Sequence, residues 1–205
     1  MCIYMATAMG KTRDKLIEVA RLLFARTGVE NTTMNDIATA SQKGRRTLYT
    51  YFKSKTDIYY AVVESELHLL YDALESVVHK EMPSDEKLLE FIRTRSDMIK
   101  HVVYRNGTLK ALFFRDIWQV ENVRKDFDTQ EIRYIQAILD EGVQKNIFVI
   151  EDTASMALIL HHACKGLEVP YIRGMVKGMN RSDSKNMESV VNLLFNGIKK
   201  KNEHS

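Results

Sequence analysis

Apolar residues recur every three or four positions along the 205-residue chain. This spacing places side chains on one face of an α-helix. No segment alternates apolar and polar residues as a half-buried strand does, and the chain has only two prolines. The pattern therefore predicts an all-α fold, with helices at about 12–27, 34–40, 45–51, 54–80, 84–104, 123–145, 153–170 and 184–200, and a short helix near Leu109, Leu112 and Phe113.

Residues 32–57 predict two short helices joined by a tight turn. Thr33 can cap the first helix through its hydroxyl, and the polar run 41–44 then interrupts the apolar pattern. Leu48 and Phe52 form an i,i+4 apolar pair on the second helix. Its other side chains are cations, hydroxyls and phenols, so the segment predicts a helix-turn-helix with a hydrogen-bonding outer face.

The flanking helices also carry end signals. Gly28 is placed to end the first helix in the left-handed conformation. Ser54 and Asp57 form a capping-box pattern that opens a long helix. The length of this helix makes it the expected lever between the N-terminal segment and the rest of the chain.

The segments TTMNDIA and TLYTYFKSKTDIYYAV resemble the N-terminal DNA-binding domain of the TetR family of transcriptional repressors. Family members read T-x-x-x-I-A, then a turn, then T-L-Y-x-Y-F-x-x-K, and the run from Thr47 to Lys55 follows the second pattern position by position. The family usually has an Ala-Gly-Val-Ser-like turn, whereas this chain has Ser41-Gln42-Lys43-Gly44 and places Arg46 where a small residue is common. The turn geometry therefore stays open, and the outer face is more basic than usual.

The resemblance implies a three-helix DNA-binding domain over residues 1–57 and a helical bundle for effector binding and dimerisation over 58–205. An arginine can bind guanine in a bidentate manner, so basic residues at the start of the second helix are candidates for base contacts. Those candidates are Lys43, Arg45, Arg46 and Thr47. Other groups are placed for phosphates or on the same outer face; these are Thr33, Tyr49, Thr50, Tyr51, Lys53 and Lys55. The alternative for each residue taken alone is a solvated surface group, an alternative that is far weaker for the cluster as a whole.

Charge is distributed unevenly along the chain. The formal net charge is +3, but residues 1–55 hold ten Lys or Arg against four Asp or Glu, which leaves the remainder net negative. A basic module joined to a mildly acidic one is typical of a polyanion-binding segment with a separate regulatory part. The predicted partner is therefore a double-stranded DNA operator.

The resemblance also implies a pocket for an unknown small-molecule effector between the helices from Ser84 to about Gly178. Candidate lining residues are Phe91, Arg95, Met98, Val102, Phe113, Trp118, Phe127, Tyr134 and His162. Polar members of this set favour an anionic or aromatic effector. The alternative for each aromatic residue is a place in the core, which is the commoner role at helical spacing.

The segments 153–170 and 184–200 predict a homodimer interface. In the first, apolar residues fall on nearly every face, and a helix apolar all round is buried all round. Two such helices that meet their symmetry mates would form a four-helix interface, as family members do. The resemblance continues through Glu141-Gly142 and Gly166-Leu167.

Other chemistries find little support. His161, Cys164 and Glu168 share a helical face, but three residues without a second cluster seldom bind a metal, so no metal or cofactor is expected. The sequence lacks a phosphate loop, a nucleophile elbow and a CxxC pair, so no enzyme activity is expected. The two cysteines, the lack of a long apolar run and the absence of a signal-peptide pattern predict a cytoplasmic protein.

The leading hypothesis is a DNA-binding regulator, most simply a repressor that an effector releases from a palindromic operator. Two alternatives remain open. One is a helical adaptor whose basic segment binds an acidic protein. The other is a DNA-binding regulator without a small-molecule effector, which responds to a partner protein or through the thiol of Cys164.

Overall fold

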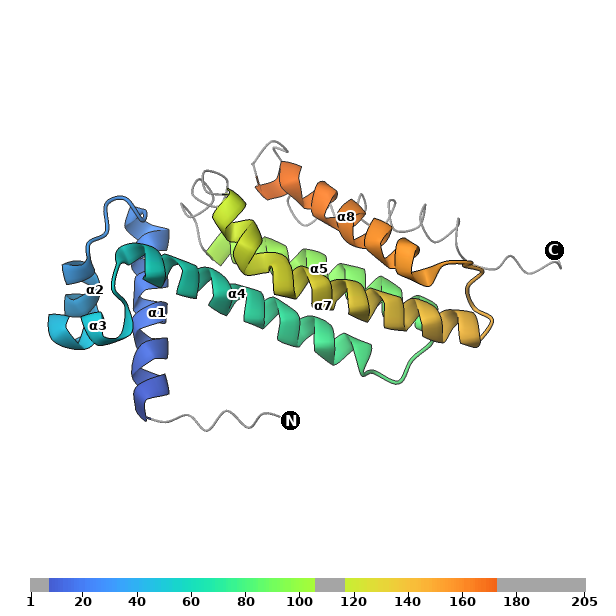
Figure 1. The fold of residues 1–205 in the computed structure, drawn as a ribbon, viewed down its shortest axis with the longest axis horizontal. Helices are drawn as coiled ribbons and strands as arrows, with labels where there is room; N and C mark the ends of the chain where they lie inside the picture. The colour runs from blue at the N-terminus through green and yellow to red at the C-terminus, as the bar shows by residue number, and fades with distance from the viewer. Residues whose placement is uncertain (1–7, 106–116, 173–205) are drawn as a thin grey trace. The chain divides into compact units, whose positions relative to one another are not determined.

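The computed structural model describes residues 8–105 and 117–172 (Figure 1). Every element in these ranges is a helix, which confirms the predicted fold class. The elements are α1 (Ala8–Thr27), α2 (Met34–Ala40), α3 (Arg45–Tyr51), α4 (Lys55–Val78), α5 (Ser84–Arg105), α7 (Ile117–Gln144) and α8 (Thr153–Ile172). The predicted helices near Leu109 and at 184–200 lie outside the described residues.

The predicted bounds hold to within a few residues, with one exception. α7 begins at Ile117, whereas the sequence pattern placed its start near Val123. The polar pair Glu121-Asn122 lies inside the helix instead of before it. Extending a helix through two polar residues costs less than nucleating a new one, so the earlier start is physically favoured.

The described chain forms two compact units. The head unit comprises residues 1–68 and 102–124, and the body unit comprises residues 69–101 and 125–205. α4 and α5 each contribute residues to both units. The predicted domain boundary after residue 57 falls within the first turn of α4, so the compact head unit is longer than the predicted DNA-binding domain.

In the head unit, α1 packs on α2 and α2 packs on α3. Leu16, Ala20 and Phe24 of α1 are fully buried. Ile37 of α2 is also inaccessible to solvent, as is Leu48 of α3, a member of the predicted apolar pair. These buried contacts fix α3 against the rest of the motif, because a small helix gains most of its stability from packing.

The turn between α2 and α3 closes in a Schellman motif. The backbone N–H of Lys43 donates to the Ala38 carbonyl at 3.0 Å, and that of Gln42 donates to the Thr39 carbonyl at 3.0 Å. Gln42 has φ 56°, which is the left-handed conformation that glycine adopts most easily. The turn is therefore a regular helix C-terminus in which glutamine occupies the glycine position.

We expect Gln42→Gly to raise the free energy of unfolding by roughly 0.5–1 kcal/mol. Glycine removes the left-handed strain of a residue that has a Cβ, although it costs some additional unfolded-state entropy. Urea unfolding followed by circular dichroism measures the change. The matched control is Asn146→Gly, because Asn146 ends α7 with φ 58° in the same motif and asparagine tolerates this conformation better. The strain argument would be contradicted if Gln42→Gly raised the free energy of unfolding no more than Asn146→Gly does.

The body unit has one apolar core built from α4, α5, α7 and α8. Its fully or nearly buried members include Leu74, Phe91, Ile138, Leu139 and Leu160. Phe148 closes the core from the connection between α7 and α8, where its ring lies against Gly142. None of the described helices combines the length and the apolar character of a membrane-spanning helix.

Candidate nucleic-acid interface

α3 presents one buried and one solvent-facing side. Gly44 is its N-cap, and Leu48 is its fully buried anchor. Arg45, Arg46, Tyr49 and Thr50 are exposed on the opposite side, and Thr47 and Tyr51 are partly buried. The structure therefore places the sequence-predicted residues of α3 on one accessible surface, as a DNA-reading helix requires.

Two capping boxes fix the helices beside α3. In the first, the Asp36 backbone N–H donates to Thr33 Oγ1 at 3.2 Å, and the Thr33 N–H donates to Asp36 Oδ2 at 2.8 Å. In the second, the Asp57 N–H donates to Ser54 Oγ at 3.1 Å and the Ser54 N–H returns a bond of 3.1 Å to Asp57 Oδ2. Hydrogen bonds from Thr33 and from Ser54 lower the pKa of the respective carboxyl group below its usual value.

Lys55 has a structural role in the head unit. Its ammonium group donates to the Val29 carbonyl at 2.6 Å and to the Glu30 carbonyl at 3.1 Å. These bonds hold the α1–α2 connection to the start of α4. An ammonium has three donor hydrogens, so the predicted phosphate contact of Lys55 remains a prediction beside this observed role.

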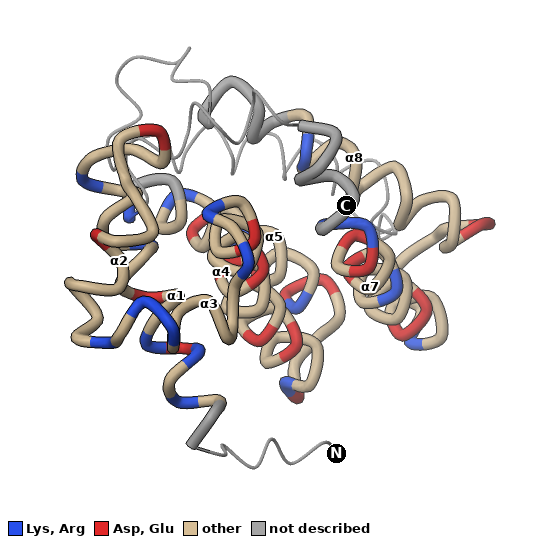
Figure 2. Tube along the Cα trace, turned by 60° about the vertical axis from the view of Figure 1, so that its left-hand side comes forward, with Lys and Arg blue, Asp and Glu red and all other residues tan. Residues whose placement is uncertain are grey.

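The remaining predicted contact residues surround α3. Thr33 and Lys53 are exposed, and Lys43 is partly buried in the turn. Figure 2 shows Lys and Arg segments around α1, α2 and α3. Arg13 of α1 lies 5.6 Å from the centre of the Phe52 ring, a cation–π distance that ties α1 to the end of α3. The head unit thus offers a basic surface on rigid elements.

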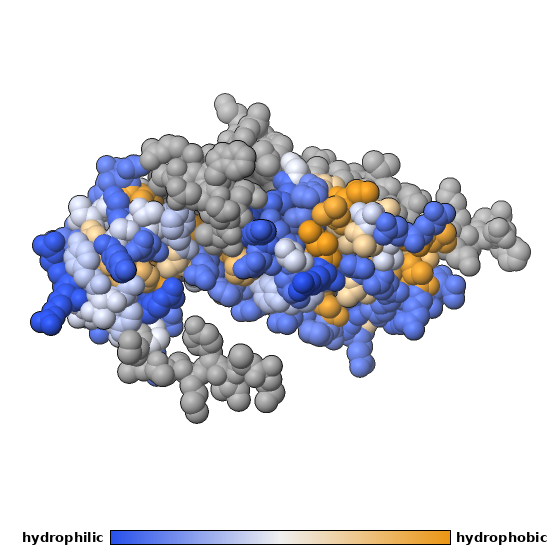
Figure 3. Space-filling view, viewed as in Figure 1, coloured by the Kyte–Doolittle hydropathy of each residue, from blue (hydrophilic) through white to orange (hydrophobic). Residues whose placement is uncertain are grey.

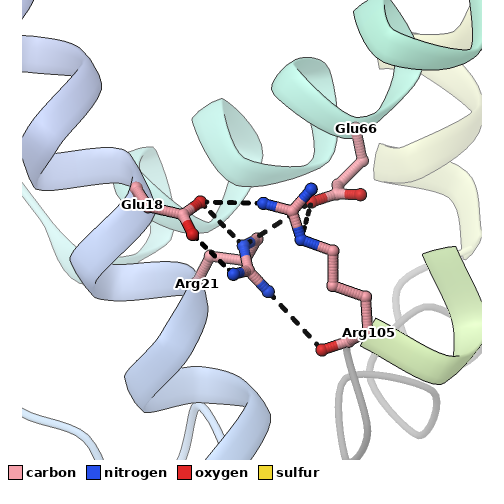
Figure 4. Close-up of polar contacts among 4 residues, drawn as sticks. All are labelled: Glu18, Arg21, Glu66 and Arg105. Atoms are coloured by element: carbon pink, nitrogen blue, oxygen red, sulfur yellow. Dashed lines mark hydrogen bonds and ion pairs between the residues drawn. The ribbon is translucent and has the colours of Figure 1, made fainter. Parts of the chain in front are cut away.

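Four charged residues join three helices within the head unit (Figure 4). Arg21 of α1 donates to both carboxylate oxygens of Glu18, at 2.8 Å from Nε and 2.6 Å from Nη2. Arg105, the last residue of α5, donates to Glu18 Oε2 at 3.0 Å. Glu66 of α4 lies 3.8 Å from the Nε atoms of both arginines. Hydrogen bonding from Arg21 lowers the pKa of the Glu18 carboxyl group below its usual value.

The predicted effector residues do not all share one environment. Phe91 and Tyr134 are in the body core, and Met98 packs against it. Arg95 is buried in the same unit, and the Phe127 ring meets the Tyr71 ring edge-on at 6.1 Å. Of the other predicted members, Val102 belongs to the head unit and His162 is exposed. Phe113 lies outside the described residues, and the Trp118 side chain is not described.

The body unit contains a buried polar cluster that the sequence reasoning did not identify as a whole. Arg95 Nε donates to Glu131 Oε1 at 2.7 Å, and His161 Nδ1 lies 2.9 Å from the same oxygen. Asp128 Oδ1 lies 3.8 Å from His161 Nε2, and Lys165 donates to Asp128 Oδ2 at 2.7 Å. The available signal was a pair of carboxylates at i,i+3 on the otherwise apolar face of α7.

Neighbouring charge stabilises the ionised carboxylate of Glu131 within this cluster. Burial favours the neutral carboxylic acid of Glu131, but the positive charge of Arg95 and the hydrogen bond to His161 outweigh it and lower the pKa of that carboxyl group. Burial raises the pKa of the neighbouring Cys164 thiol. A buried thiol that stays protonated is a poor nucleophile, which weakens the hypothesis of regulation through Cys164.

A surface groove of the body unit lies at the α4–α5 connection. Its lining includes Val78, Pro83, Lys87, Glu141 and Ile147. None of the predicted effector residues lines this groove. The residues predicted to contact an effector therefore do not form this groove.

A short, exposed and basic second helix, positioned by a tight turn and two capping boxes, defines a helix-turn-helix DNA-binding protein. Residues 16–62 match the family model described as "Bacterial regulatory proteins, tetR family". This match covers more than half of α1, all of α2 and α3, and the start of α4. Over these residues the chain is similar to the TetR family of transcriptional regulators.

Comparisons with individual proteins agree with this assignment. The chain is 27% identical over 179 residues to a protein of Escherichia coli strain K12 named "Probable acrEF/envCD operon repressor", and the match covers 80% of this chain and 78% of the relative. It is 41% identical over 59 residues to a helix-turn-helix transcriptional regulator of Staphylococcus aureus strain USA300, covering 29% and 32% of the two chains.

The fold is also that of known regulators. A TetR/AcrR-family transcriptional regulator from Thermobifida fusca superposes with a TM-score of 0.74 at 21% identity. The superposition covers 91% of this chain and 98% of that one. At this identity the likeness establishes the fold alone.

Proposed function

We propose that the protein is a repressor that binds a palindromic operator as a homodimer and that a small-molecule effector releases it. The observation that carries this proposal is the accessible basic face of α3, held by Leu48 and by the capped helices on either side. The E. coli relative, named as an operon repressor, supports repression over activation. A helix in this position reads base edges, whereas surrounding cations set affinity through phosphates.

The dimer part of the proposal rests on α8. Ala157 and Leu160 face the body core, but Leu158 and Ile159 of the same helix remain 45% and 57% exposed. Figure 3 shows apolar side chains gathered on the surface over α7 and α8. A second copy of the chain is the occupant that suits this face, because two symmetric heads match a two-part operator. The predicted second interface helix at 184–200 lies outside the described residues.

We expect Ile159→Glu to convert the dimer largely to monomers, because a charge buried in an apolar interface is unpaired. Sedimentation velocity measures the change. The matched control is Val149→Glu, which introduces the same charge at a residue that is 65% exposed and precedes α8. A variant at Ile159 that remains dimeric would exclude this face of α8 from the interface.

The effector part of the proposal places the ligand in the body unit, with Arg95 and the neighbouring aromatic residues as its candidate contacts. A ligand shifts the population of states only by its differential affinity for them. A thermal-shift screen with anionic and lipophilic compounds tests it, since a tight ligand raises the melting temperature. A compound that raises the melting temperature without weakening operator binding would bind the protein but would not be its effector.

Selection from random DNA followed by sequencing tests the DNA part of the proposal. The wild-type protein is expected to enrich one palindrome. Arg46→Ala is expected to reduce discrimination at one base pair in each half-site by about 1–3 kcal/mol, the worth of a bidentate arginine contact. Lys125→Ala is the matched control, because it removes an exposed cation of the body unit. Retention of DNA without enrichment would favour the adaptor alternative.

A further inference from the structure

We propose that Glu18, Arg21, Glu66 and Arg105 form a charge clamp of positioning residues that orients the DNA-reading helices and so sets the half-site spacing that the dimer accepts. The inference rests on the proposed function, since spacing has meaning only for two heads on a two-part operator. None of these four residues is on the predicted DNA-contact surface.

The charge clamp joins three helices through alternating charges (Figure 4). Two carboxylates alternate with two guanidinium groups, so the cluster is neutral as a whole. Arg21 Nη1 also donates to the backbone carbonyl of Arg105 at 3.5 Å. The last carbonyls of a helix have no partner within it and carry partial negative charge, so Arg21 also caps the C-terminus of α5.

The helices that meet at the clamp determine the orientation of the reading helix. α1 packs on α2, and α2 packs on α3, so an orientation imposed on α1 passes to α3. α4 and α5 each extend from the head unit into residues of the body unit. The clamp is therefore the place where the DNA-reading motif is fastened by charge to both of these helices.

The bonds of the clamp are distributed unequally between its two carboxylates. Glu18 accepts hydrogen bonds of 2.6 to 3.0 Å and is half exposed. Glu66 is buried, yet both guanidinium groups approach it only to 3.8 Å. Its Oε2 atom has no hydrogen-bond partner among the described residues.

This inequality leaves Glu66 as a second acceptor beside the same two guanidinium groups. A guanidinium group has five donors in a planar fork, so a small shift at the end of α5 can transfer hydrogen bonds from Glu18 to Glu66. Such a transfer exchanges a half-exposed acceptor for a buried one without changing the net charge.

The test measures binding to a set of duplexes that carry the selected palindrome with half-site spacings changed by one or two base pairs, and to a duplex with one half-site. Wild-type protein is expected to prefer one spacing by about tenfold or more. Arg105→Gln is expected to bind the single half-site within about twofold of wild type and to lose most of the spacing preference. Network residues couple strongly enough for an effect of about this size.

Glu64→Gln is the matched control. Glu64 of α4 pairs with Arg13 of α1 at 3.9 Å in an exposed position, so this variant loses an α1–α4 ion pair that does not include α5. It is expected to keep the spacing preference. Arg105→Lys keeps the positive charge but loses the planar guanidinium group, so it is expected to keep part of the spacing preference. If Arg105→Gln does not fold, Glu18→Gln removes a half-exposed member of the clamp and takes its place.

The outcomes are distinguishable. A wild-type protein without spacing preference would contradict the proposed function, whatever the variants do. A wild-type preference that Arg105→Gln and Glu18→Gln both retain would overturn the clamp. Equal losses of affinity for the single half-site and for every palindrome would also overturn the clamp. They would show that the head unit is damaged and that its orientation has not changed.

Discussion

Glu131→Gln is expected to lower the free energy of unfolding by about 3–5 kcal/mol, which is the usual cost of removing one partner from a buried ion pair. The substitution preserves shape, so it leaves no cavity. It does remove the carboxylate charge that lies 2.7 Å from the guanidinium of Arg95, a residue that is 1% exposed. An arginine side chain keeps its positive charge in proteins, so the variant retains a buried cation.

Chemical unfolding followed by circular dichroism measures this loss. Asp97→Asn is the control, because Asp97 pairs with Lys100 at 3.4 Å on the exposed side of α5 and an exposed pair contributes about 1 kcal/mol or less. The double variant Arg95→Met with Glu131→Leu is expected to recover much of the loss, since it leaves no buried charge from this pair. A loss below about 1 kcal/mol in Glu131→Gln would show that the pair is not a buried electrostatic unit.

The same carboxylate gives the stability a defined pH dependence. The pKa of Glu131 is lower in the folded state than its ordinary value of 4.5. Its contribution is therefore fully present above that value and is lost as the pH falls from 4.5 through the folded-state pKa. The stability difference between wild type and Glu131→Gln is expected to shrink over this acid range and to stay constant between pH 6 and 8.

Gly142→Ala is expected to lower the free energy of unfolding by about 3 kcal/mol or more, because a core of this density cannot accept an added atom without displacement. A Cβ at this position would lie 2.1 Å from Cδ2 and 2.4 Å from Cε2 of Phe148. The Phe148 ring is 3% exposed and closes the body core, so it has no open space into which to move. The backbone bond from the Ile147 N–H to the Gly142 carbonyl, at 2.8 Å, fixes the other side of the contact.

Gly166→Ala provides a control of opposite sign. Gly166 lies within α8, and no heavy atom beyond the neighbouring residues and the local helix backbone lies within 4 Å of an added Cβ. Gly166 shares the face of α8 that carries Ile159, so both glycine variants are compared in the Ile159→Glu background, which removes the proposed interface. Alanine at Gly166 is then expected to stabilise the helix by roughly 0.5–1 kcal/mol through its better helix propensity. Thermal unfolding of both variants should therefore shift in opposite directions. Similar shifts at the two positions would contradict the packing argument for Gly142.

Local signals predicted the DNA-binding motif well. The caps at Thr33 and Ser54, the ends of α2 and α3, and the buried pair Leu48 and Phe52 all depend on residues within a few positions of each other. Such short-range preferences act through the backbone and need no knowledge of the tertiary structure. The left-handed residue of the turn was less predictable, because glutamine carries no sequence signal for positive φ.

Long-range pairings could not be predicted in the same way. Arg95 and Glu131 come from different helices, and Glu18 and Arg105 are 87 positions apart in the sequence. In the sequence these residues look like ordinary charged positions. Only the packing of the helices brings them together. The sequence also did not predict which face of α8 is buried, because its apolar residues fall on nearly every face. The structure buries His161 and leaves His162, the predicted effector contact, exposed.

The most direct test of the central claim is hydroxyl-radical footprinting on the selected duplex, combined with the protein-to-DNA ratio from sedimentation. Two chains per duplex are expected, with two protected half-sites whose centres lie about 10–10.5 base pairs, or a multiple of this, apart. Arg46→Ala should weaken both protected regions together. One chain per duplex, or protection without a repeated half-site, would contradict a pair of α3 helices reading successive major grooves.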